Sequence, residues 1–330
     1  MRKAVVVEPN HIEIVEAPIP RPSPTQVLIE TRAVGLCTTD LYVISGKDPD
    51  AAYPTELVGH EPNGVVVEVG GEVKQFRPGD RVATLWAVGG FMAFADYYLQ
   101  EEPHVFRLPE SVPFAFGLAE PLAAISRAVF GADIQPGDTV GVVGAGYFGQ
   151  LIAQGARYRG AYRVGVVDPI AERLAVAQRR GADGVCRPAE DGIARAVAEL
   201  TGGTGFDLVF EVAGVQGGLD TATELVRHAG TIYVYGLHVR QETLNIKAWH
   251  TKCPRIQNNH WQYPVEFGAE RWRRLGAIGL DMLARGMYCC DEIITGITGL
   301  EDLAEACEAM MHRPREIIKA VIGPKAAGIE

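Results

Sequence analysis

Apolar runs of strand length follow two different patterns along the chain. Over residues 1–125 they are short and separated by turn-forming Gly, Pro, Asn and Asp, which predicts a β-rich domain built as a partly open barrel. Over residues 126–261 apolar strands alternate with helix-length segments, which predicts a doubly wound parallel sheet. Residues 262–330 have little core of their own, so we expect this tail to complete the first domain. The predicted fold class is α/β.

The individual elements follow from the same patterns. In the first domain we expect strands at residues 4–7, 26–32, 64–69, 81–86 and 95–99. In the second domain we expect six strands: near residues 139–143 and 163–168, a third after the turn at 181–183, and then near 207–212, 231–235 and 255–258, with helices over 150–159 and 170–180. In the tail we expect helices over residues 270–285 and 300–311 and strands at 292–295 and 317–322.

The predicted strand at residues 139–143 leads into a glycine-rich turn. Gly144, Gly146 and Gly149 follow it at G-x-G-x-x-G spacing, and a helix is predicted next. In this context the first glycine allows the tight turn, the second lets the backbone approach a pyrophosphate, and the third lets the helix pack on the strand. We interpret the segment as a dinucleotide site, in which Tyr147 and Phe148 also contact the cofactor.

An acidic residue ends the next predicted strand. Asp168 lies nineteen residues beyond Gly149. An acid at this place accepts hydrogen bonds from the ribose hydroxyls of NAD and repels the 2′-phosphate of NADP, so we predict NAD. Arg173, on the following helix, is a candidate 2′-phosphate ligand, but beside Asp168 we expect it to lie on a solvated helix face.

Composition and charge narrow the class of protein. The 330 residues are enough for two domains, and 47% hydrophobic with 22% charged residues is ordinary for a soluble protein. A net charge of −10 argues against a nucleic acid or an anionic membrane as partner. No apolar run reaches the length of a membrane span, and the first residues become charged too soon for a signal peptide. We therefore expect a cytoplasmic protein.

The cysteines show no disulfide framework. They stand at positions 37, 186, 253, 289, 290 and 307 without regular spacing. In a cytosolic chain of this size we expect reduced thiols, with a metal ligand as the informative exception.

Three places in the first domain carry candidate metal ligands. Cys37 lies in a turn after an extended run, His60 and Glu61 are adjacent just before a strand, and Glu120 interrupts an apolar stretch. One thiolate, one imidazole and carboxylate oxygens suit zinc, with a position left for water or substrate. Each residue also has a structural interpretation: Cys37 as an inert buried thiol, His60 as a hydrogen-bonded core histidine, and Glu120 as an acid at a helix entry. Taken singly, the residues leave both interpretations open.

Several ordered motifs together resemble one known family. They are Gly35-x-Cys37-x-Thr39-Asp40, Gly59-His60-Glu61, Gly79-Asp80-Arg81-Val82, Glu120-Pro121-Leu122 and the glycine turn. This set resembles the medium-chain dehydrogenase/reductase superfamily and, within it, the zinc-dependent alcohol and polyol dehydrogenases of the sorbitol dehydrogenase type. The resemblance covers essentially the whole chain, including the closing strand that begins at Lys319.

The resemblance implies a GroES-like β-barrel catalytic domain, formed by residues 1–125 and 262–330, and a Rossmann domain over 126–261. It also implies that Cys37 and His60 are zinc ligands, and that Glu61 and Glu120 are a third ligand and a ligand or water-holding carboxylate. Thr39 would accept the substrate proton, although a turn-forming threonine is the ordinary alternative.

The implied reaction is hydride transfer between NAD and a secondary alcohol or ketone, with a polyol, sugar or cyclitol as the favoured substrate. The loops after the fourth and fifth Rossmann strands would contact the two ends of the cofactor through Ala213, Gly236 and Leu237, whereas Glu211 is interpreted as structural. Relatives form homodimers or homotetramers, so the same is expected of this chain.

The sequence departs from the family pattern at two places. No cysteine lies between Val82 and Asp96, where relatives carry a four-cysteine structural-zinc lobe, so we predict one catalytic zinc and no structural zinc. Tyr42 replaces a histidine that relatives use to pass the proton onward, which leaves the outer part of this relay open.

Substrate contacts are less well defined by the sequence. Tyr42 and Trp86 are candidate substrate contacts, and Trp86 is equally well a core residue. The cluster 258–261 either lines the cleft near the nicotinamide or forms a loop.

Charge counting gives a further expectation. The Cys37 thiolate and one glutamate together cancel the +2 charge of zinc. Binding of both Glu61 and Glu120 would leave the site at −1 and oppose loss of the alcohol proton. We therefore expect one of the two glutamates to bind directly at a time.

Two other classes remain as alternatives. One is a zinc-free NAD(P)H quinone or enoyl reductase of the same superfamily, against which Cys37, His60 and Asp168 all argue. The other is a non-catalytic NAD-binding protein on the same scaffold, which predicts a blocked site and no metal.

Overall fold

The computed structural model describes residues 1–85, 93–258 and 264–323. Contacts between Cα atoms divide the chain into two compact units. The first unit contains Met1–Ala123, Gly268–Gly286 and the chain from Ile294 onward, and the second contains Ala124–Phe267 and Met287–Ile293. No helix within the described ranges is long and apolar enough to cross a membrane.

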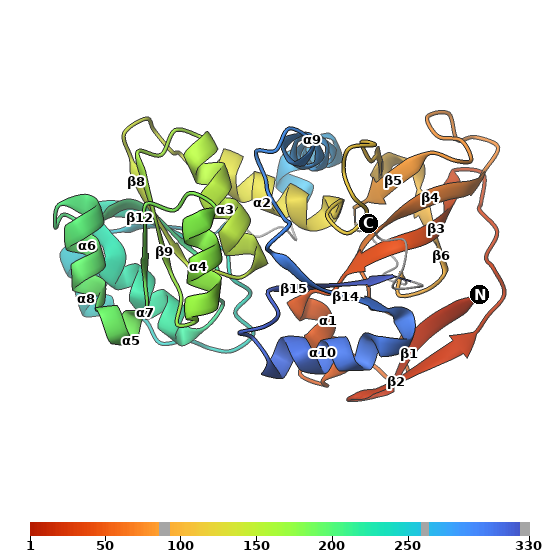
Figure 1. Ribbon diagram of the computed structural model, residues 1–330, viewed down its shortest axis with the longest axis horizontal. Helices are drawn as coiled ribbons and strands as arrows, with labels where there is room; N and C mark the ends of the chain where they lie inside the picture. Colours follow the sequence, from red (N-terminus) through yellow and green to blue (C-terminus); the bar gives the residue numbers. More distant parts are fainter. Residues whose placement is uncertain (86–92, 259–263, 324–330) are drawn as a thin grey trace. The chain divides into compact units, whose positions relative to one another are not determined.

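A seven-stranded sheet organises the first unit (Figure 1). Its order is β14–β15–β3–β4–β5–β7, with β6 paired to β3, and a separate hairpin joins β1 to β2. The strands are β1 (Arg2–Glu8), β2 (His11–Glu16), β3 (Gln26–Gly35), β4 (Glu61–Val69), β5 (Arg81–Thr84), β6 (Tyr97–Glu101), β7 (Val105–Arg107), β14 (Ile294–Gly299) and β15 (Lys319–Gly323). Segments far apart in the sequence therefore lie side by side in this sheet.

The register of three strands brings distant residues to one point. β3 pairs antiparallel with β4 so that Gly35 lies opposite Glu61. On its other side β3 pairs antiparallel with β15 so that Gly35 lies opposite Val321. The end of β3 is thus flanked by the start of β4 and the body of β15, and the candidate metal ligands gather here.

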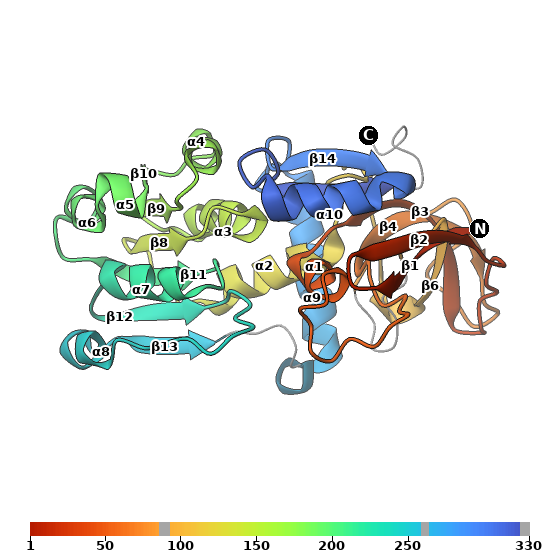
Figure 2. The same cartoon turned by 90° about the horizontal axis from the view of Figure 1, so that it is seen from below.

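Helices complete the first unit. α1 (Thr38–Ile44) begins directly after Cys37, where the Asp40 carboxylate Oδ2 accepts the Cys37 N–H at 2.9 Å and caps the first turn. α10 (Leu303–His312), preceded by the short η2 (Leu300–Asp302), lies along β14 in Figure 2 and also contacts β15. The remaining helices are η1 (Glu102–His104), α9 (Pro264–Ala284) and α2 (Ala119–Gly131), which begins in the first unit and ends in the second.

The second unit is built on a six-stranded parallel sheet. Its order is β10–β9–β8–β11–β12–β13, which Figure 2 shows from top to bottom. The strands are β8 (Thr139–Val143), β9 (Arg163–Val167), β10 (Gly184–Cys186), β11 (Phe206–Glu211), β12 (Val226–Val234) and β13 (Arg255–Asn258). In chain order this is 3-2-1-4-5-6, the arrangement of dinucleotide-binding Rossmann sheets.

Helices cover both faces of this parallel sheet. α3 (Tyr147–Tyr158) and α4 (Ala171–Arg179) pack beside one another on β8, β9 and β10. The other helices are α5 (Pro188–Asp191), α6 (Ile193–Thr201), α7 (Gln216–Leu225) and α8 (Ile246–Lys252). The two groups of helices lie on opposite sides of the strands in Figure 1.

The glycine turn explains where α3 begins. The helix starts at Tyr147, three residues before the predicted position 150, with Gly146 as its N-cap. Gly144 has a φ of +105°, which favours glycine. A Cβ at Gly149 would lie 1.7 Å from the Gly144 carbonyl oxygen. The first helical turn therefore fits against the loop only because Gly149 has no side chain.

Several other element boundaries differ from the sequence prediction. β2 was not predicted, although Ile12 and Ile14 alternate with polar residues there, and none of its side chains is fully buried. β12 begins at Val226 and α9 at Pro264, both earlier than predicted, whereas β14 is shifted towards Gly299. Trp86 and residues 259–261, singled out in the sequence, lie outside the described ranges.

We expect Gly149→Ala to destabilise the second unit. The added Cβ meets backbone rather than a flexible side chain, so the apparent melting temperature should fall by about 4 °C or more. Gly217→Ala is the control, because a Cβ at that position in α7 meets nothing within 4 Å and should leave the melting temperature unchanged or slightly raised. Thermal unfolding followed by circular dichroism measures both, and equal melting temperatures would contradict the packing argument.

Candidate active site

Three potential metal ligands meet in the first unit. One ligand atom from each of Cys37, His60 and Glu61 lies within 4.8 Å of the others. Cys37 precedes α1, His60 precedes β4, and Glu61 is the first residue of β4. His60 and Glu61 are buried and Cys37 is partly buried. No other group of three such side chains occurs among the residues that the structure describes.

Asp40 holds two of these ligands in place. Its Oδ1 lies 3.2 Å from His60 Nδ1 and accepts the Gly59 N–H at 2.9 Å. Its Oδ2 accepts the N–H of Cys37 at 2.9 Å. With Nδ1 assigned as the donor to Asp40, Nε2 is the nitrogen that a metal ion would take. A carboxylate that orients a ligand histidine in this way also raises its basicity.

The buried Asp40–His60 pair shifts both pKa values. Burial opposes the charge of Asp40, but the His60 imidazole and the N–H groups of Gly59 and Cys37 outweigh it and lower the pKa of the carboxyl. Burial also opposes the charge of His60, but Asp40 and the Cys37 sulfur outweigh it and raise the pKa of the imidazole well above its usual value. Without a metal ion, the surroundings of His60 therefore favour the protonated imidazole.

Glu61 is paired on one side. Its Oε2 lies 2.5 Å from Lys319 Nζ, and both side chains are buried. Burial opposes the charge of Lys319, but Glu61 and the Cys37 sulfur outweigh it and raise the pKa of the ammonium. Gly35 leaves room for this pair, since a Cβ there would lie 2.0 Å from Glu61 Oε2.

The second oxygen of Glu61 fits a cation. Oε1 is buried and has no hydrogen-bond partner within the described part of the chain. A buried carboxylate oxygen without a partner is costly unless something satisfies it. Together with the thiol of Cys37 and the imidazole of His60, it makes the sulfur, nitrogen and oxygen donor set that zinc accepts.

Glu120 lies close to this group but outside the triplet. It stands in the first turn of α2 and is only 6% exposed. Burial raises the pKa of Glu120 to about 7, while His60 and Lys319 oppose the shift and Glu61 and Asp40 add to it. The proximity of these four groups places the carboxyl beside the candidate metal site.

Thr39 and Tyr42 both lie on α1. The hydroxyl of Thr39 is 3.7 Å from Cys37 Sγ, so it is next to the candidate metal site. Tyr42 is partly buried, one turn further along the helix.

The second unit has a pocket where the sequence predicts the adenosine end of a dinucleotide. The pocket has a volume of about 280 Å³ and is lined by Gly144, Asp168, Arg187, Ala213 and neighbouring residues. The buried Asp168 accepts the N–H of Ala145 at 2.7 Å on one oxygen and that of Ile170 at 2.8 Å on the other. The carboxylate is therefore fixed at the carboxyl end of β9, where ligands bind in such sheets.

Two arginines lie near Asp168. Arg187 forms ion pairs with Glu190 and Asp191, so its charge is matched within its own segment. The expectation of a solvated helix face for Arg173 is wrong. Burial lowers the pKa of Arg173, although Asp168 opposes the shift, and a Cβ on Gly146 would lie 3.8 Å from its Nη1. Sequence spacing placed Arg173 on a helix but not on the side that faces the glycine turn.

The remaining predicted cofactor contacts lie around the strand ends. Tyr147 is buried at the start of α3, and the ring of the neighbouring Phe148 lies 6.1 Å from that of Tyr235. Gly236 follows β12 and comes so near the preceding loop that a Cβ there would be 2.4 Å from the Gly214 nitrogen. Leu237 is 37% exposed.

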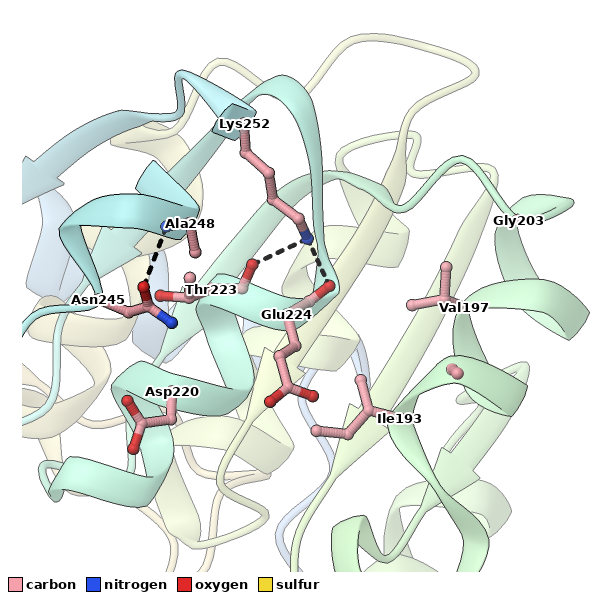
Figure 3. A pocket seen from close by; sticks show the side chains of 10 residues that line it. Ile193, Val197, Gly203, Asp220, Thr223, Glu224, Asn245, Ala248 and Lys252 are labelled. Carbon is pink, nitrogen blue, oxygen red and sulfur yellow. Dashed lines mark hydrogen bonds between the residues drawn. The ribbon is translucent and has the colours of Figure 1, made fainter. Parts of the chain in front are cut away.

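A larger pocket, of about 590 Å³, lies elsewhere in the second unit among residues of α6, α7 and α8 (Figure 3). Lys252 Nζ donates to the carbonyl oxygens of Thr223, Glu224 and Val226 at 2.9, 2.7 and 2.8 Å, which holds its charge at the C-terminal end of α7. These carbonyls lie next to the start of β12, whereas dinucleotides bind at the carboxyl ends of such strands. We assign no cofactor to this pocket.

Sequence reasoning did not assign a role to Asp40 or Lys319. Both were quoted inside motifs, and both carried a detectable signal. Asp40 is an acid three residues after Cys37, the position that caps a helix. Lys319 is a lone charge in an apolar strand, and a buried lysine requires a partner.

Comparison with known proteins agrees with this architecture. The chain matches the model of the alcohol dehydrogenase GroES-like domain over residues 23–112 and that of the zinc-binding dehydrogenase over residues 148–275. The zinc-type alcohol dehydrogenase-like protein YdjJ of Escherichia coli is 30% identical, with 97% of this chain and 98% of that protein covered. The sorbitol dehydrogenase of Bacillus subtilis is 28% identical, with 98% and 97% covered.

A solved structure supports the same conclusion. An Escherichia coli oxidoreductase/dehydrogenase of unknown specificity superposes with a TM-score of 0.86 at 28% identity, covering 98% of both chains.

The fold and the donor set thus define a zinc-type dehydrogenase. The chain belongs to the zinc-dependent alcohol dehydrogenases of the medium-chain dehydrogenase/reductase superfamily, in the polyol dehydrogenase branch. The predicted fold class and family are confirmed, and the protein is an oxidoreductase of small molecules from a family of zinc-binding dehydrogenases.

We expect Asp40→Asn to weaken zinc binding. The substitution keeps the shape but removes the charge that orients and polarises His60, so zinc affinity should fall about 10- to 100-fold. Asp50→Asn is the control, because Asp50 is exposed. Competition with a zinc-binding dye measures the affinity, and a value for Asp40→Asn within twofold of the wild type would contradict the assigned role.

We also expect zinc uptake by the metal-free protein to release protons. The pKa of His60 is raised, which favours a protonated ring nitrogen that the metal must displace. Apparent zinc affinity should therefore rise with pH, because protons are released as the metal binds. Calorimetry in two buffers of different ionisation enthalpy counts the released protons, and an affinity independent of pH would exclude this exchange.

Proposed function

We propose that the protein transfers hydride between NAD and a secondary alcohol or ketone, with a polyol, sugar or cyclitol as substrate. The observation that carries this proposal is the triplet of a partly buried Cys37 with the buried His60 and Glu61, in which Glu61 Oε1 has no hydrogen-bond partner among the described residues. The similarity to the sorbitol dehydrogenase of Bacillus subtilis supports the choice of substrate class.

One zinc ion is held by Cys37, His60 and Glu61 in this proposal. When bound there, zinc acts as a Lewis acid that lowers the pKa of an alcohol and so eases removal of its proton. Asp40 keeps the His60 ring in orientation. The chain has no cysteine between positions 37 and 186, so a second, four-cysteine zinc site is not expected.

The surrounding charges favour a protonated Glu120. With His60 neutral, zinc and Lys319 supply three positive charges, which Cys37, Glu61 and Asp40 balance. An ionised Glu120 would leave an excess negative charge and oppose loss of the alcohol proton. We therefore assign Glu61 as the direct ligand and Glu120 as the group that holds water or substrate through its carboxyl proton.

Thr39 receives the proton of the alcohol in this mechanism. Its Oγ1 lies beside Cys37 Sγ, and a hydroxyl both accepts and donates, so it can pass the proton on. Tyr42, further along α1, and Trp86 remain proposed substrate contacts.

NAD is the proposed dinucleotide. The buried Asp168 carboxylate repels a 2′-phosphate, and Arg187 is already paired with acids of its own segment. Gly144, Gly146 and Gly149 let the backbone approach the pyrophosphate, and Tyr147, Phe148, Ala213, Gly236 and Leu237 supply further contacts.

The same proposal includes assembly as a homodimer or homotetramer and a cytoplasmic location. It also includes a division into a catalytic domain, residues 1–125 with 262–330, and a Rossmann domain, residues 126–261.

The test combines metal analysis with activity. Purified protein should contain one zinc per chain and reduce NAD with at least one polyol from a panel of sugar alcohols, cyclitols and vicinal diols. Cys37→Ser should lose zinc and lower kcat/KM by about 1000-fold or more, because the thiolate ligand is removed. Cys253→Ser, at an exposed position, is the matched control and should retain both zinc and activity.

Three results would contradict the proposal. Reduction of quinones or enones by NADPH that survives removal of zinc by a chelator would favour the zinc-free reductase. Binding of NAD without metal or activity would favour a non-catalytic protein. A higher kcat/KM with NADP than with NAD would overturn the role of Asp168.

A further inference from the structure

A fully buried glutamate connects two loops of the second unit. Glu211 is the last residue of β11 and is 0% exposed. Its Oε1 accepts the N–H groups of Ala213 and Gly214, both at 2.9 Å. Its backbone carbonyl accepts the N–H groups of Tyr235 and Gly236 at 2.8 and 2.9 Å. One residue therefore fixes both the loop that follows β11 and the loop that follows β12.

His238 occupies the other oxygen of this carboxylate. His238 Nε2 lies 2.9 Å from Glu211 Oε2, and Nδ1 lies 3.6 Å from Glu242 Oε1. The imidazole is 15% exposed, and its Nδ1 has no hydrogen-bond partner in the described chain. Glu211 and Glu242 are the carboxylates that face it, on β11 and on its own loop. The His238 ring thus links the loop that follows β12 (the β12 loop) to the Glu211 carboxylate, which is buried beneath the loop that follows β11 (the β11 loop).

The two loops are in direct backbone contact at this place. Gly214 has a φ of +66°, and a Cβ on it would lie 2.7 Å from the Leu237 carbonyl oxygen. A Cβ on Gly236 would lie 2.4 Å from the Gly214 nitrogen and 2.8 Å from Glu211 Oε2. A small displacement of either loop is therefore transmitted to the other.

Side chains beyond this junction give the β12 loop little further anchorage. Leu237 and Val239 are 37% and 50% exposed, and Leu244 is 43% exposed. At the far end Gln216 Nε2 donates to the Thr243 carbonyl at 2.8 Å, and its Oε1 accepts the Thr243 N–H at 2.6 Å. The loop is thus held by Gln216 at its far end and by His238 at the end next to Gly236.

We propose that His238 is a positioning residue for the dinucleotide, acting through Glu211 on the backbone of residues 213–214 and 236–237. The inference rests on the proposed function, because Ala213, Gly236 and Leu237 are cofactor contacts there. Ala213 also lines the pocket of about 280 Å³ that contains Asp168. Without the imidazole, Glu211 Oε2 is a buried carboxylate oxygen lacking its donor, and water or a loop rearrangement must satisfy it.

The test measures binding of NADH to the metal-free protein by fluorescence and calorimetry, so that it does not depend on zinc or turnover. His238→Leu keeps the volume but removes the donor, and NADH should bind about 10- to 100-fold more weakly. His238→Gln offers an N–H in a similar place and should recover affinity to within about threefold of wild type. Gln216→Ala, which releases only the far end of the loop, is the matched control and should bind nearly as tightly as wild type.

Two further readouts separate positioning from general stability. In the zinc-loaded enzyme, His238→Leu should raise the KM for NAD and leave the KM for the alcohol unchanged. Amide exchange should accelerate at residues 213–214 and 236–237 and stay unchanged in α8. Should His238→Leu fail to fold, His238→Ser replaces it, because water can then reach Glu211, and the same loss of affinity is expected.

The outcomes distinguish this inference from the proposed function. NADH binding by His238→Leu within twofold of wild type overturns the positioning role and leaves the NAD site intact. Failure of the wild-type protein to bind NADH overturns the dinucleotide site itself. Equal losses in His238→Leu and His238→Gln also overturn the inference, because the donated hydrogen bond would then not be the cause.

Discussion

Buried charge around Gly35 is the constraint on which the first unit depends. Taking a carboxylate out of water costs several kcal/mol unless a cation or N–H donors satisfy it. Asp40 is satisfied by His60 and two backbone N–H groups, and Glu61 by Lys319 on one oxygen only. The other oxygen completes a donor set of sulfur, nitrogen and oxygen that a divalent cation satisfies. The arrangement that suits a metal ion is thus the arrangement that makes these buried charges tolerable.

The sheet topology supplies these charges from distant parts of the chain. β3 ends beside Cys37, β4 begins at Glu61, and β15 begins at Lys319. Gly35, at the end of β3, leaves space for the Glu61–Lys319 pair because it has no side chain. The C-terminal strand is therefore part of the site as well as of the sheet, since it carries the cation that matches Glu61.

A buried carboxylate has a comparable role in the second unit. Glu211 ends β11 and accepts N–H groups from the following loop, and Asp40 in α1 accepts the N–H groups of Cys37 and Gly59. In both cases the carboxylate also contacts a histidine, His238 in one unit and His60 in the other. The two histidines differ in their neighbours. His60 lies close to Cys37 and Glu61, a combination that suits a metal ion. His238 lies between the carboxylates of Glu211 and Glu242, without a thiol among these contacts.

The sequence by itself determined the features that local chemistry dictates. The β8–α3–β9 segment follows from its glycines, because the positive φ of Gly144 and the tight contact of Gly149 exclude a side chain. The sequence also contains the types of side chain that bind metal. Their local pattern does not show that they lie together, since Cys37 and His60 are 23 residues apart and are brought close by the pairing of β3 with β4. Only the tertiary structure decided that Lys319, 258 residues after Glu61, neutralises it, and that Arg173 faces the glycine turn. Burial and ion pairing depend on which distant segments pack together, and no local pattern encodes that.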